Sequence, residues 1–490
     1  MTTTALLFSL AILSFSLAQG LHPRSCDAPE QGSTLKVFHV NSPCSPFRPR
    51  TQLSWQDTVL QMQSNDKARL LYLSSLVAGR SIVPLASARA VVQNPTYIVK
   101  AKIGTPAQTL LMAVDTSNDA AWVPCTGCVG CSSTTYNSAK SSTFKPLKCG
   151  AAQCSQVPNP SCDGATCGFN VTYGSSAVTA TLVQDNVTLA TDSIHGYTFG
   201  CVQKTTGSSF PAQGLLGLGR GPLSLLSQAG NLYRSTFSYC LPSYKSVGFT
   251  GSLRLGPNSQ PLRIKTTQLL KNPRRSSFYY VNLMAIRVGR RVVNIPPSAF
   301  AFDPNTGAGT VFDSGTVFTS LVKPAYTAVR DEVRRRMGNA TVSSLGGFDT
   351  CYGVPFNVPT ITFMFSGMNV TLPQDNFIIR SSSSTISCLA MAAAPEGNVN
   401  SVLNVIASFQ QQNHRILIDV PNSRLGSRAS HAARLANIWG WFGIFVCFGG
   451  MCCTKKSLSR VGFVGVGVAV RKSVTGFSDY LEMLNSHWLS

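Results

Sequence analysis

The chain contains two versions of one short pattern, one in each half. Ala113-Val-Asp115-Thr-Ser recurs as Val311-Phe-Asp313-Ser-Gly, so each copy sets an aspartate and a hydroxyl residue after apolar residues. A second apolar stretch follows each copy, Gly214-Leu-Leu-Gly in the first half and Leu403-Asn-Val-Ile-Ala in the second. A single aspartate after a strand is commonly a turn former. Two matching sites instead indicate two β-rich lobes that each contribute one aspartate.

The two aspartates suggest a specific chemistry. If the lobes face each other, Asp115 and Asp313 meet, and two carboxylates about 3 Å apart share one proton because they cannot both ionise. One carboxylate then acts as a base on water, and the protonated one acts as an acid toward a carbonyl. The pair titrates as a unit. We therefore expect Asp115 and Asp313 to be catalytic in peptide hydrolysis, with no metal, no cofactor and no covalent intermediate.

Residues next to the aspartates are expected to support the pair. A small residue two positions after each aspartate lets backbone N–H groups approach the carboxylates, and a side chain three positions on can donate to the outer oxygen. The expected support residues are Thr116, Ser117, Asn118, Ser314, Gly315 and Thr316. A serine nucleophile at Ser314 is disfavoured because no Gly-x-Ser-x-Gly elbow surrounds it.

The N-terminus and the cysteines indicate export. Residues 1–20 have an apolar core followed by Ala18-Gln-Gly20, which is typical of a secretory signal peptide, although the segment before the core lacks Lys and Arg. An uncleaved anchor is the alternative. In an exported protein the 16 cysteines indicate disulfides. Cys125, Cys128 and Cys131 have spacing that could suggest zinc, but no closing His or Cys pair follows. The glycosylation sequons begin at Asn170, Asn186, Asn339 and Asn369.

The charge distribution disfavours a nucleic-acid partner. The formal net charge is +22, with 41 Lys and Arg against 19 Asp and Glu. These basic residues are scattered rather than gathered in runs, as polyanion-binding segments usually are. From Tyr97 to about Gly426, short alternating stretches between Gly, Pro, Ser and Asn clusters predict a mostly β protein. Helices are expected at 57–76 and 323–337.

From about Tyr97 to Gly426 the sequence resembles the pepsin-type aspartic proteases, and most of all their nepenthesin-like plant branch. Asp313-Ser-Gly-Thr316 matches the second active-site motif of that family, and Asp115-Thr-Ser-Asn118 lies where the first belongs. Trp122-Val-Pro matches the segment behind the first aspartate, and Tyr173 matches the tyrosine of the hairpin that closes over substrate. The cysteine-rich stretch 125–154 is typical of the nepenthesin branch. The resemblance also implies a disulfide between Cys351 and Cys388.

This resemblance implies a mostly β, bilobal pepsin-like fold with the active-site cleft between two β-rich lobes. The expected organisation is a signal peptide (1–20), a propeptide (21–90), an N-terminal lobe (91–260) with the cysteine-rich insert, a C-terminal lobe (261–426) and an atypical tail (427–490). It further implies a secreted, glycosylated zymogen of the plant apoplast or cell wall. The protein is expected to be a monomer and to act on peptide or protein substrates. Basic propeptide residues are expected to pair with carboxylates near neutral pH, and acidification is expected to release them.

Two features depart from the family pattern. Ser117 replaces the usual glycine, where a positive φ would now be costly, and Asn118 replaces the usual serine. Neither change removes a carboxylate. A catalytically weak or inactive pepsin-fold binding or inhibitor protein is therefore the alternative function.

The C-terminal tail has two open interpretations. Residues 435–453 are apolar apart from Asn437, and nineteen helical residues span about 28 Å, close to the thickness of a bilayer core. If the protein is anchored in a membrane, we expect residues 435–453 to be the segment that spans it. The other interpretation is a splicing or gene-model artefact, because the tail begins inside an expected strand and resembles nothing in the family.

Overall fold

The computed structural model of the protein describes residues 29–48, 53–78, 97–131, 134–157, 160–173, 176–206, 213–243, 250–273, 277–380, 386–395 and 402–429. The expected signal peptide (1–20), most of the tail and its apolar segment 435–453 lie outside these residues. Within the described part of the chain, no helix is both long and apolar enough to cross a membrane.

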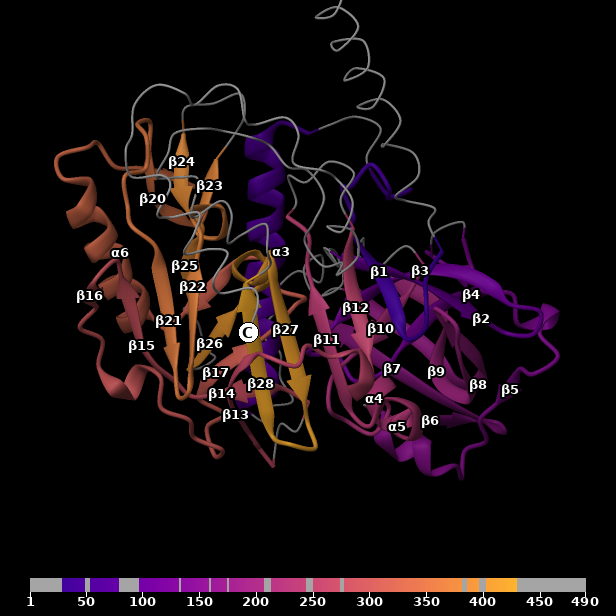
Figure 1. Cartoon of the computed structure of the whole chain (residues 1–490). Helices are drawn as coiled ribbons and strands as arrows, with labels where there is room; N and C mark the ends of the chain where they lie inside the picture. The colour runs from indigo at the N-terminus through magenta and orange to yellow at the C-terminus, as the bar shows by residue number, and fades with distance from the viewer. Residues whose placement is uncertain are drawn as a thin grey trace, which may run out of the picture. The chain divides into compact units, whose positions relative to one another are not determined.

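Two β-rich lobes make up most of the described chain, as expected (Figure 1). The N-terminal lobe contains β2 (Tyr97–Ile103), β3 (Gln108–Asp115), β4 (Trp122–Val129), β5 (Lys145–Pro146), β6 (Pro160–Asp163), β7 (Thr166–Tyr173), β8 (Ser176–Leu189), β9 (Asp192–Thr206) and β10 (Leu215–Gly217). The short helices α4 (Leu225–Gln228) and α5 (Gly230–Tyr233) follow. The long hairpin β8–β9 pairs along most of its length. Its apolar side chains and those of β2 and β3 form the core of this lobe.

The C-terminal lobe repeats this kind of architecture with shorter strands. It contains β14 (Tyr279–Val281), β15 (Leu283–Val288), β16 (Arg291–Val292), β17 (Gly309–Phe312), β18 (Thr319–Leu321), β19 (Ser343–Leu345), β20 (Phe348–Tyr352), β21 (Ile361–Phe365), β22 (Met368–Leu372), β23 (Ile378–Arg380), β24 (Ser387–Leu389), β25 (Met391–Ala393) and β26 (Leu403–Ile406). Helix α6 (Lys323–Met337) has the bounds that the sequence predicts, with Pro324 in its first turn. The short helix α7 (Ser408–Gln411) follows β26.

The internal repeat found in the sequence corresponds to the same parallel pairing of two strands in each lobe. In the first half β10 lies parallel to β3, with Gly217 opposite Asp115. In the second half β26 lies parallel to β17, with Ile406 opposite Phe312, the residue before Asp313. Each aspartate therefore lies at the end of a strand that a later apolar strand supports.

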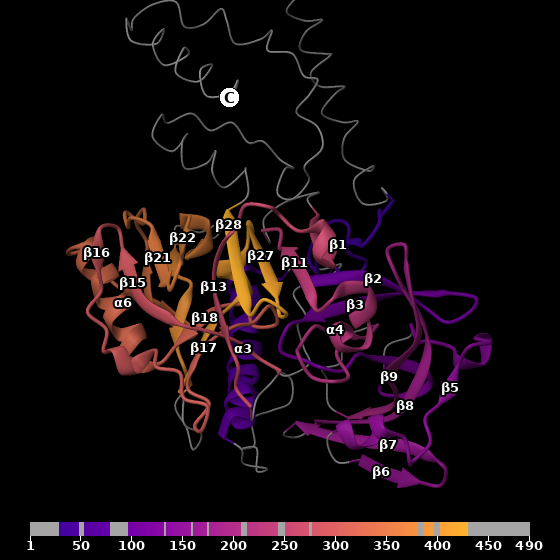
Figure 2. The same ribbon diagram turned by 60° about the horizontal axis from the view of Figure 1, so that its bottom comes forward.

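An antiparallel sheet of six strands joins the lobes. Its order is β1 (Thr34–His39), β12 (Gly251–Leu255), β11 (Thr236–Cys240), β27 (His414–Asp419), β28 (Arg424–Ala429) and β13 (Lys265–Leu270). Figure 2 shows its central strands side by side. Strand β28 continues beyond Gly426 to Ala429, with Ser427 opposite Lys265. The sheet therefore includes the first three residues that the sequence assigns to the tail.

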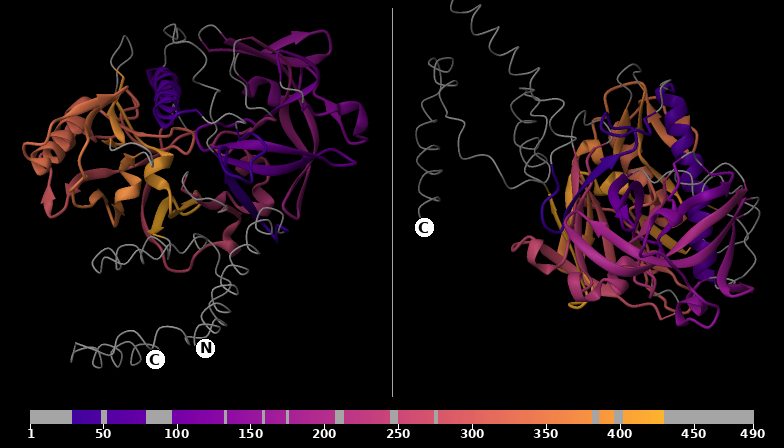
Figure 3. Two further views of the ribbon diagram at one scale, coloured as in Figure 1. Left: turned by 90° about the horizontal axis from the view of Figure 1, so that it is seen from above. Right: turned by 90° about the vertical axis from the view of Figure 1, so that its right-hand side faces the viewer.

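The segment before the N-terminal lobe also contributes ordered structure. Strand β1 adds an edge to the joining sheet, and α3 (Trp55–Ala78) is a long helix that slightly exceeds its predicted bounds. Ser54 caps it, because the Ser54 hydroxyl accepts the Asp57 N–H at 3.1 Å and donates to the Asp57 carboxylate at 2.6 Å. Helix α3, indigo in Figure 3, lies between the two lobes.

Disulfides account for ten cysteines of the two lobes. The bonded pairs are Cys125–Cys201, Cys128–Cys131, Cys149–Cys162, Cys154–Cys167 and Cys351–Cys388. The last pair is the one that the resemblance implies. Cys125, Cys128 and Cys131 are therefore not zinc ligands. Cys240 is also disulfide-bonded.

The glycosylation sequons differ in accessibility. Asn170, Asn339 and Asn369 are exposed. Asn186 is half-buried, and its amide contacts the Thr105 hydroxyl at 3.4 Å. The first three sites are thus the more accessible ones for a glycan.

The joining sheet depends on large buried side chains, and this gives a stability prediction. Phe237 in β11 is fully buried between the rings of Tyr239 and Tyr279. We expect Phe237→Ala to lower the free energy of unfolding by about 3–5 kcal/mol, because the change removes apolar contacts and leaves a cavity. Urea denaturation followed by circular dichroism measures this change.

The control is Val292→Ala, since Val292 is 53% exposed in β16. It should change the free energy of unfolding by no more than about 0.5 kcal/mol. If both variants unfold at the same urea concentration, Phe237 does not have the structural role described here.

Candidate functional site

The two aspartates come together because the loops that follow their strands bind each other. The Ser314 N–H donates to the Thr116 hydroxyl at 2.9 Å, and the Thr116 N–H donates to the Ser314 hydroxyl at 3.2 Å. This reciprocal pair connects the loop after β3 to the loop after β17. Asp115 and Asp313 are both buried, with side chains 4% and 0% exposed. The structure therefore places the two sequence-predicted carboxylates side by side.

Each carboxylate accepts hydrogen bonds from its own loop. Asp115 accepts the Ser117 N–H at 2.8 Å and the Asn118 amide at 2.9 Å. Asn118 thus supplies a donor from the position where the family usually has serine.

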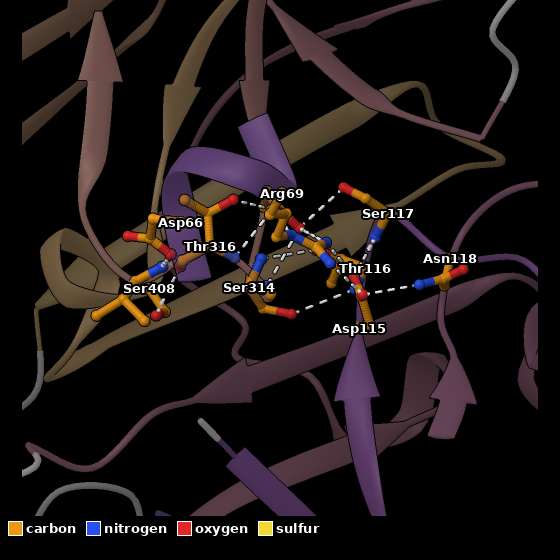
Figure 4. A network of polar contacts seen from close by, with 12 residues as sticks. Asp66, Arg69, Asp115, Thr116, Ser117, Asn118, Ser314, Thr316 and Ser408 are labelled. Carbon is orange, nitrogen blue, oxygen red and sulfur yellow. Dashed lines mark hydrogen bonds and ion pairs between the residues drawn. The ribbon is translucent and has the colours of Figure 1, made fainter. Parts of the chain in front are cut away.

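Asp313 accepts more donors than Asp115. They are the Gly315 N–H at 3.1 Å, the Thr316 N–H at 3.0 Å and the Thr316 hydroxyl at 2.5 Å. The Ser117 hydroxyl adds a fourth donor from the opposite lobe at 2.9 Å. All six predicted support residues therefore lie at the pair, as Figure 4 shows for the five that it labels.

A guanidinium group from α3 lies between the carboxylates. Arg69 contacts Asp115 through Nη1 at 2.8 Å and Nη2 at 2.7 Å. It contacts Asp313 through Nε at 2.9 Å and Nη2 at 2.9 Å. Such a planar fork of donors suits two carboxylates at once. One buried cation therefore bridges the aspartates of both lobes, and Figure 4 shows it beside Asp115.

Gly315 provides the space for this cation. A Cβ atom at position 315 would lie 2.4 Å from Arg69 Nη2 and 2.5 Å from its Cζ. Any larger residue would push the guanidinium out of its position. Glycine at position 315 is therefore required for the contact of Arg69 with the pair.

Asp66 anchors α3 one turn before Arg69. Its two carboxylate oxygens accept the N–H groups of Val317 and Phe318 at 2.8 and 2.7 Å. Gln63 lies on the same face of the helix, where its amide donates to the Leu345 carbonyl at 3.1 Å and accepts the Gly347 N–H at 2.7 Å. Since residues three apart share a helix face, these side chains form one polar row directed at the C-terminal lobe.

Apolar contacts continue along the same helix. Val59 and Met62 pack with Phe318 and Phe348 in one buried cluster. Leu70 and Leu73 pack in another, which contains Phe278, Tyr280 and Val311. Arg69 thus lies between two apolar contacts that hold α3 against the C-terminal lobe.

The charges explain the ionisation of the site. Burial would raise the pKa of Asp313, but Arg69 and the hydroxyls of Thr316 and Ser117 hold that pKa below its ordinary value. Burial would lower the pKa of Arg69, but Asp115 and Asp313 raise it well above its ordinary value. The guanidinium and Asp313 are therefore both charged in this arrangement.

Asp66 has the opposite shift. Burial raises the pKa of this carboxyl to about 7, although the two backbone N–H groups and Arg69 act against that change. Asp66 therefore binds a proton more readily here than it would on an undocked helix.

Two other predicted site residues belong to strands of the N-terminal lobe. Trp122 begins β4, is half-buried, and packs beside a cluster that includes Phe169 and Leu182. Tyr173 ends β7, and its backbone pairs with Ser176 in the hairpin β7–β8. Their roles toward a substrate stay predictions.

The sequence did not single out Arg69 and Asp66. Arg69 appeared only as one of several basic residues before the N-terminal lobe. A signal was nevertheless present, because Gln63, Asp66, Arg69, Leu70 and Leu73 recur at helical spacing along one face. Polar residues on the face expected to be buried need partners, and only the fold identifies them.

Comparison with known proteins agrees with this geometry. Residues 97–257 match the domain family described as xylanase inhibitor N-terminal, and residues 278–428 match that described as xylanase inhibitor C-terminal. The chain is 49% identical over 413 residues to Aspartyl protease AED3 of Arabidopsis thaliana, covering 81% of this chain and 92% of that protein. It is 34% identical over 341 residues to Aspartic proteinase nepenthesin-1 of Nepenthes gracilis, covering 67% and 76%.

Solved structures show the same fold at lower identity. The structure of edgp has a TM-score of 0.55 at 21% identity, covering 68% of this chain and 91% of that one. Basic 7S globulin from soybean has a TM-score of 0.54 at 20% identity, covering 69% and 95%. These two likenesses concern the fold alone. The family models and the sequence relatives show that the chain belongs to the pepsin-type aspartic protease family, in its nepenthesin-like plant branch.

Proposed function

We propose that the described structure is the inactive precursor of a secreted aspartic endopeptidase whose catalytic pair is Asp115 and Asp313. The observation that carries this proposal is the Arg69 guanidinium, which contacts both carboxylates at 2.7–2.9 Å. A cation at this position occupies the place where the water and the scissile carbonyl would have to bind. It also holds the pKa of Asp313 below its ordinary value, and its positive charge opposes the single shared proton that catalysis needs.

After α3 leaves, the pair regains its shared proton. The ionised carboxylate takes a proton from water as that water attacks the peptide carbonyl, and the protonated carboxyl donates to the carbonyl oxygen. The Val317 and Phe318 N–H groups, which Asp66 occupies in the precursor, then become available to carbonyl oxygens of an extended peptide. The apolar surfaces released by Val59, Met62, Leu70 and Leu73 favour substrates with bulky apolar side chains.

The remaining parts of the proposal extend the sequence predictions. Residues 1–20 would direct export to the cell wall space and would be removed as a signal peptide. A second cleavage between about residues 75 and 96 would separate α3 from the N-terminal lobe. The mature protein would act as a monomer on peptide or protein substrates.

The alternative function is a pepsin-fold binding protein without turnover. Both matched domain families are described as parts of xylanase inhibitors, and this supports the alternative. The donors on both carboxylates favour an enzyme, because a protein that only binds has no need to keep Asp115 and Asp313 buried and fully hydrogen-bonded.

The catalytic assignment gives a direct test. We expect Asp115→Asn and Asp313→Asn each to lower kcat/KM on a denatured protein substrate by at least about 10³-fold, because neither variant can hold one shared proton between two carboxylates. Activity is measured after acid treatment, with and without a peptide that carries a secondary hydroxyl in place of the scissile amide.

Asp375→Asn is the control, since Asp375 lies in the C-terminal lobe and its carboxylate is 63% exposed. Its activity should equal that of the unmodified protein. If either dyad variant keeps full activity, the assigned mechanism is wrong; if the unmodified protein binds the hydroxyl peptide without hydrolysing substrate, the binding-protein alternative is correct.

The inhibitory contact gives a second prediction. We expect Arg69→Gln to give the full-length protein activity before acid treatment, because removal of one partner from a buried ion pair costs about 3–5 kcal/mol and weakens docking of α3. Initial rates on a fluorogenic peptide, compared with the unmodified precursor at the same pH, measure the gain.

Lys67→Gln is a matched control, since it removes the same charge from an exposed position of the same helix. It should leave the precursor inactive. Equal activity of both variants would show that loss of positive charge in α3, rather than the contact with the pair, controls the enzyme.

The raised pKa of Asp66 gives a pH dependence. Because this pKa is about 7 in the docked state, above its value in an undocked helix, the contribution of Asp66 to docking is fully present below about pH 4 and is lost as the pH rises through 7. Asp313 has a lowered pKa, so its contribution is present above about pH 4 and is lost in stronger acid. Mild acidification alone should therefore hold α3 in place, and release requires protonation of the pair.

Hydrogen exchange of the Val317 and Phe318 amides measures this effect. After correction for intrinsic exchange rates, we expect at least about tenfold greater protection at pH 5 than at pH 7. Asp66→Asn should remove the difference, and Asp57→Asn, an exposed change in the same helix, should keep it. Lower protection at pH 5 than at pH 7 in the unmodified protein would contradict this account.

A further inference from the structure

The hydrogen bonds around the catalytic pair are unequal once Arg69 is set aside. Among the described residues, Asp313 keeps four donors: the Ser117 hydroxyl, the Gly315 N–H, the Thr316 N–H and the Thr316 hydroxyl. Asp115 keeps two donors, the Ser117 N–H and the Asn118 amide. Donors that point at a carboxylate stabilise its ionised form.

Ser117 and the Thr316 N–H supply the two donors on Asp313 that have no counterpart on Asp115, and Ser117 is the one that departs from the family pattern. Its buried hydroxyl crosses from the loop after β3 and donates to Asp313 Oδ1 at 2.9 Å. The matching position in the other lobe is Gly315, which has no side chain to donate to Asp115. The family's usual glycine at position 117 would leave Asp313 without this cross-lobe donor. The serine therefore adds a charge-stabilising contact to one member of the pair only.

We propose that Ser117 is a positioning residue that fixes the direction of the shared proton, so that Asp313 is the ionised member of the pair and Asp115 carries the proton. The inference rests on the proposed function and assigns a role to each carboxylate within it. Asp313 then accepts a proton from the attacking water, and Asp115 donates its proton to the carbonyl oxygen of the scissile bond. As the resulting gem-diol collapses, Asp313 gives its proton to the leaving nitrogen while the C–N bond breaks, and Asp115 takes a proton back from a diol hydroxyl, which restores the pair.

Other charged and titratable groups also face the pair. Asp66 and Arg69 leave with α3. Burial and the charge of Asp115 raise the pKa of Asp119, in the loop after β3, although the Ser277 hydroxyl and the Gly221 N–H act against that change. Tyr239 in β11 faces Asp313. Burial raises the pKa of this phenol well above its ordinary value, and the Asp313 charge raises it further, so the phenol stays neutral.

The substitution of glycine by serine thus has a chemical consequence. A serine at this position restricts the backbone, which from the sequence alone suggests weakened catalysis. In the fold, φ at Ser117 is not among the positive values, so no backbone strain arises there. The hydroxyl instead determines that Asp313 acts as the base and Asp115 as the acid.

Three variants in the acid-treated full-length chain test the proposal through the pH profile of kcat/KM. Ser117→Ala removes the hydroxyl and keeps Cβ, and Ser117→Gly removes both. We expect both to move the acid limb of the profile upward by about one pH unit, because a hydrogen bond to a charged group is lost from the carboxylate that must be ionised. Asn118→Ala removes a donor from Asp115, so it should move the alkaline limb upward and leave the acid limb in place.

Specific outcomes would overturn the proposal. If Ser117→Ala moves the alkaline limb and Asn118→Ala the acid limb, the roles of the two carboxylates are reversed. A shift in Ser117→Gly without one in Ser117→Ala would assign the effect to the backbone rather than to the hydroxyl. A profile that neither serine variant moves would show that the hydroxyl has no influence on the proton.

A second measurement separates this proposal from the proposed function. Calorimetric binding of the peptide with a secondary hydroxyl is followed over the same pH range, because that ligand also requires one proton on the pair. If the unmodified protein hydrolyses no peptide, the proposed function fails. In the serine variants the acid limit of binding moves upward if the proton lies on Asp115, and the alkaline limit moves instead if the proton lies on Asp313.

Discussion

Two buried carboxylates from different lobes lie side by side only when something offsets their repulsion. In this protein the offset has two parts. Hydrogen-bond donors from the flanking loops surround each carboxylate, and the Arg69 guanidinium places one positive charge between them. Under the proposed function this cation would stabilise the site and keep it inactive at once, because the contacts that satisfy the charges would fill the position of the reacting groups.

The joining sheet makes this arrangement possible. Strands β11 and β27 belong to different halves of the sequence and pair across the molecule, which fixes the distance between the loops of Asp115 and Asp313. The reciprocal bonds of Thr116 and Ser314 then set the local geometry. Strand β1 and helix α3 both come from the segment before the N-terminal lobe. One segment thus supports the sheet at one end and occupies the site at the other.

Helix α3 combines two kinds of interaction that respond differently to pH. Its apolar residues contribute a docking energy that does not depend on protonation. The contacts of Asp66 and Arg69 contribute docking energies that change in opposite directions with pH. The pKa of Asp66 is raised in the docked state, whereas the pKa of Asp313, which contacts Arg69, is lowered. Under the proposed function, this opposition would keep the helix in place over a range of mild acidity and confine its release to low pH.

Apolar periodicity and short motifs are local properties, so they were enough to predict the duplicated Asp-hydroxyl pattern, the mostly β class, the helix 323–337 and the identity of the two carboxylates. They also indicated the region before the lobes as a separate segment. The folded chain was needed to show which of several basic residues meets the pair, and that Ser117 donates across the lobes to Asp313. Such contacts join residues 196 and 244 positions apart, and the spacing of residues along a chain does not specify which buried donor reaches which acceptor.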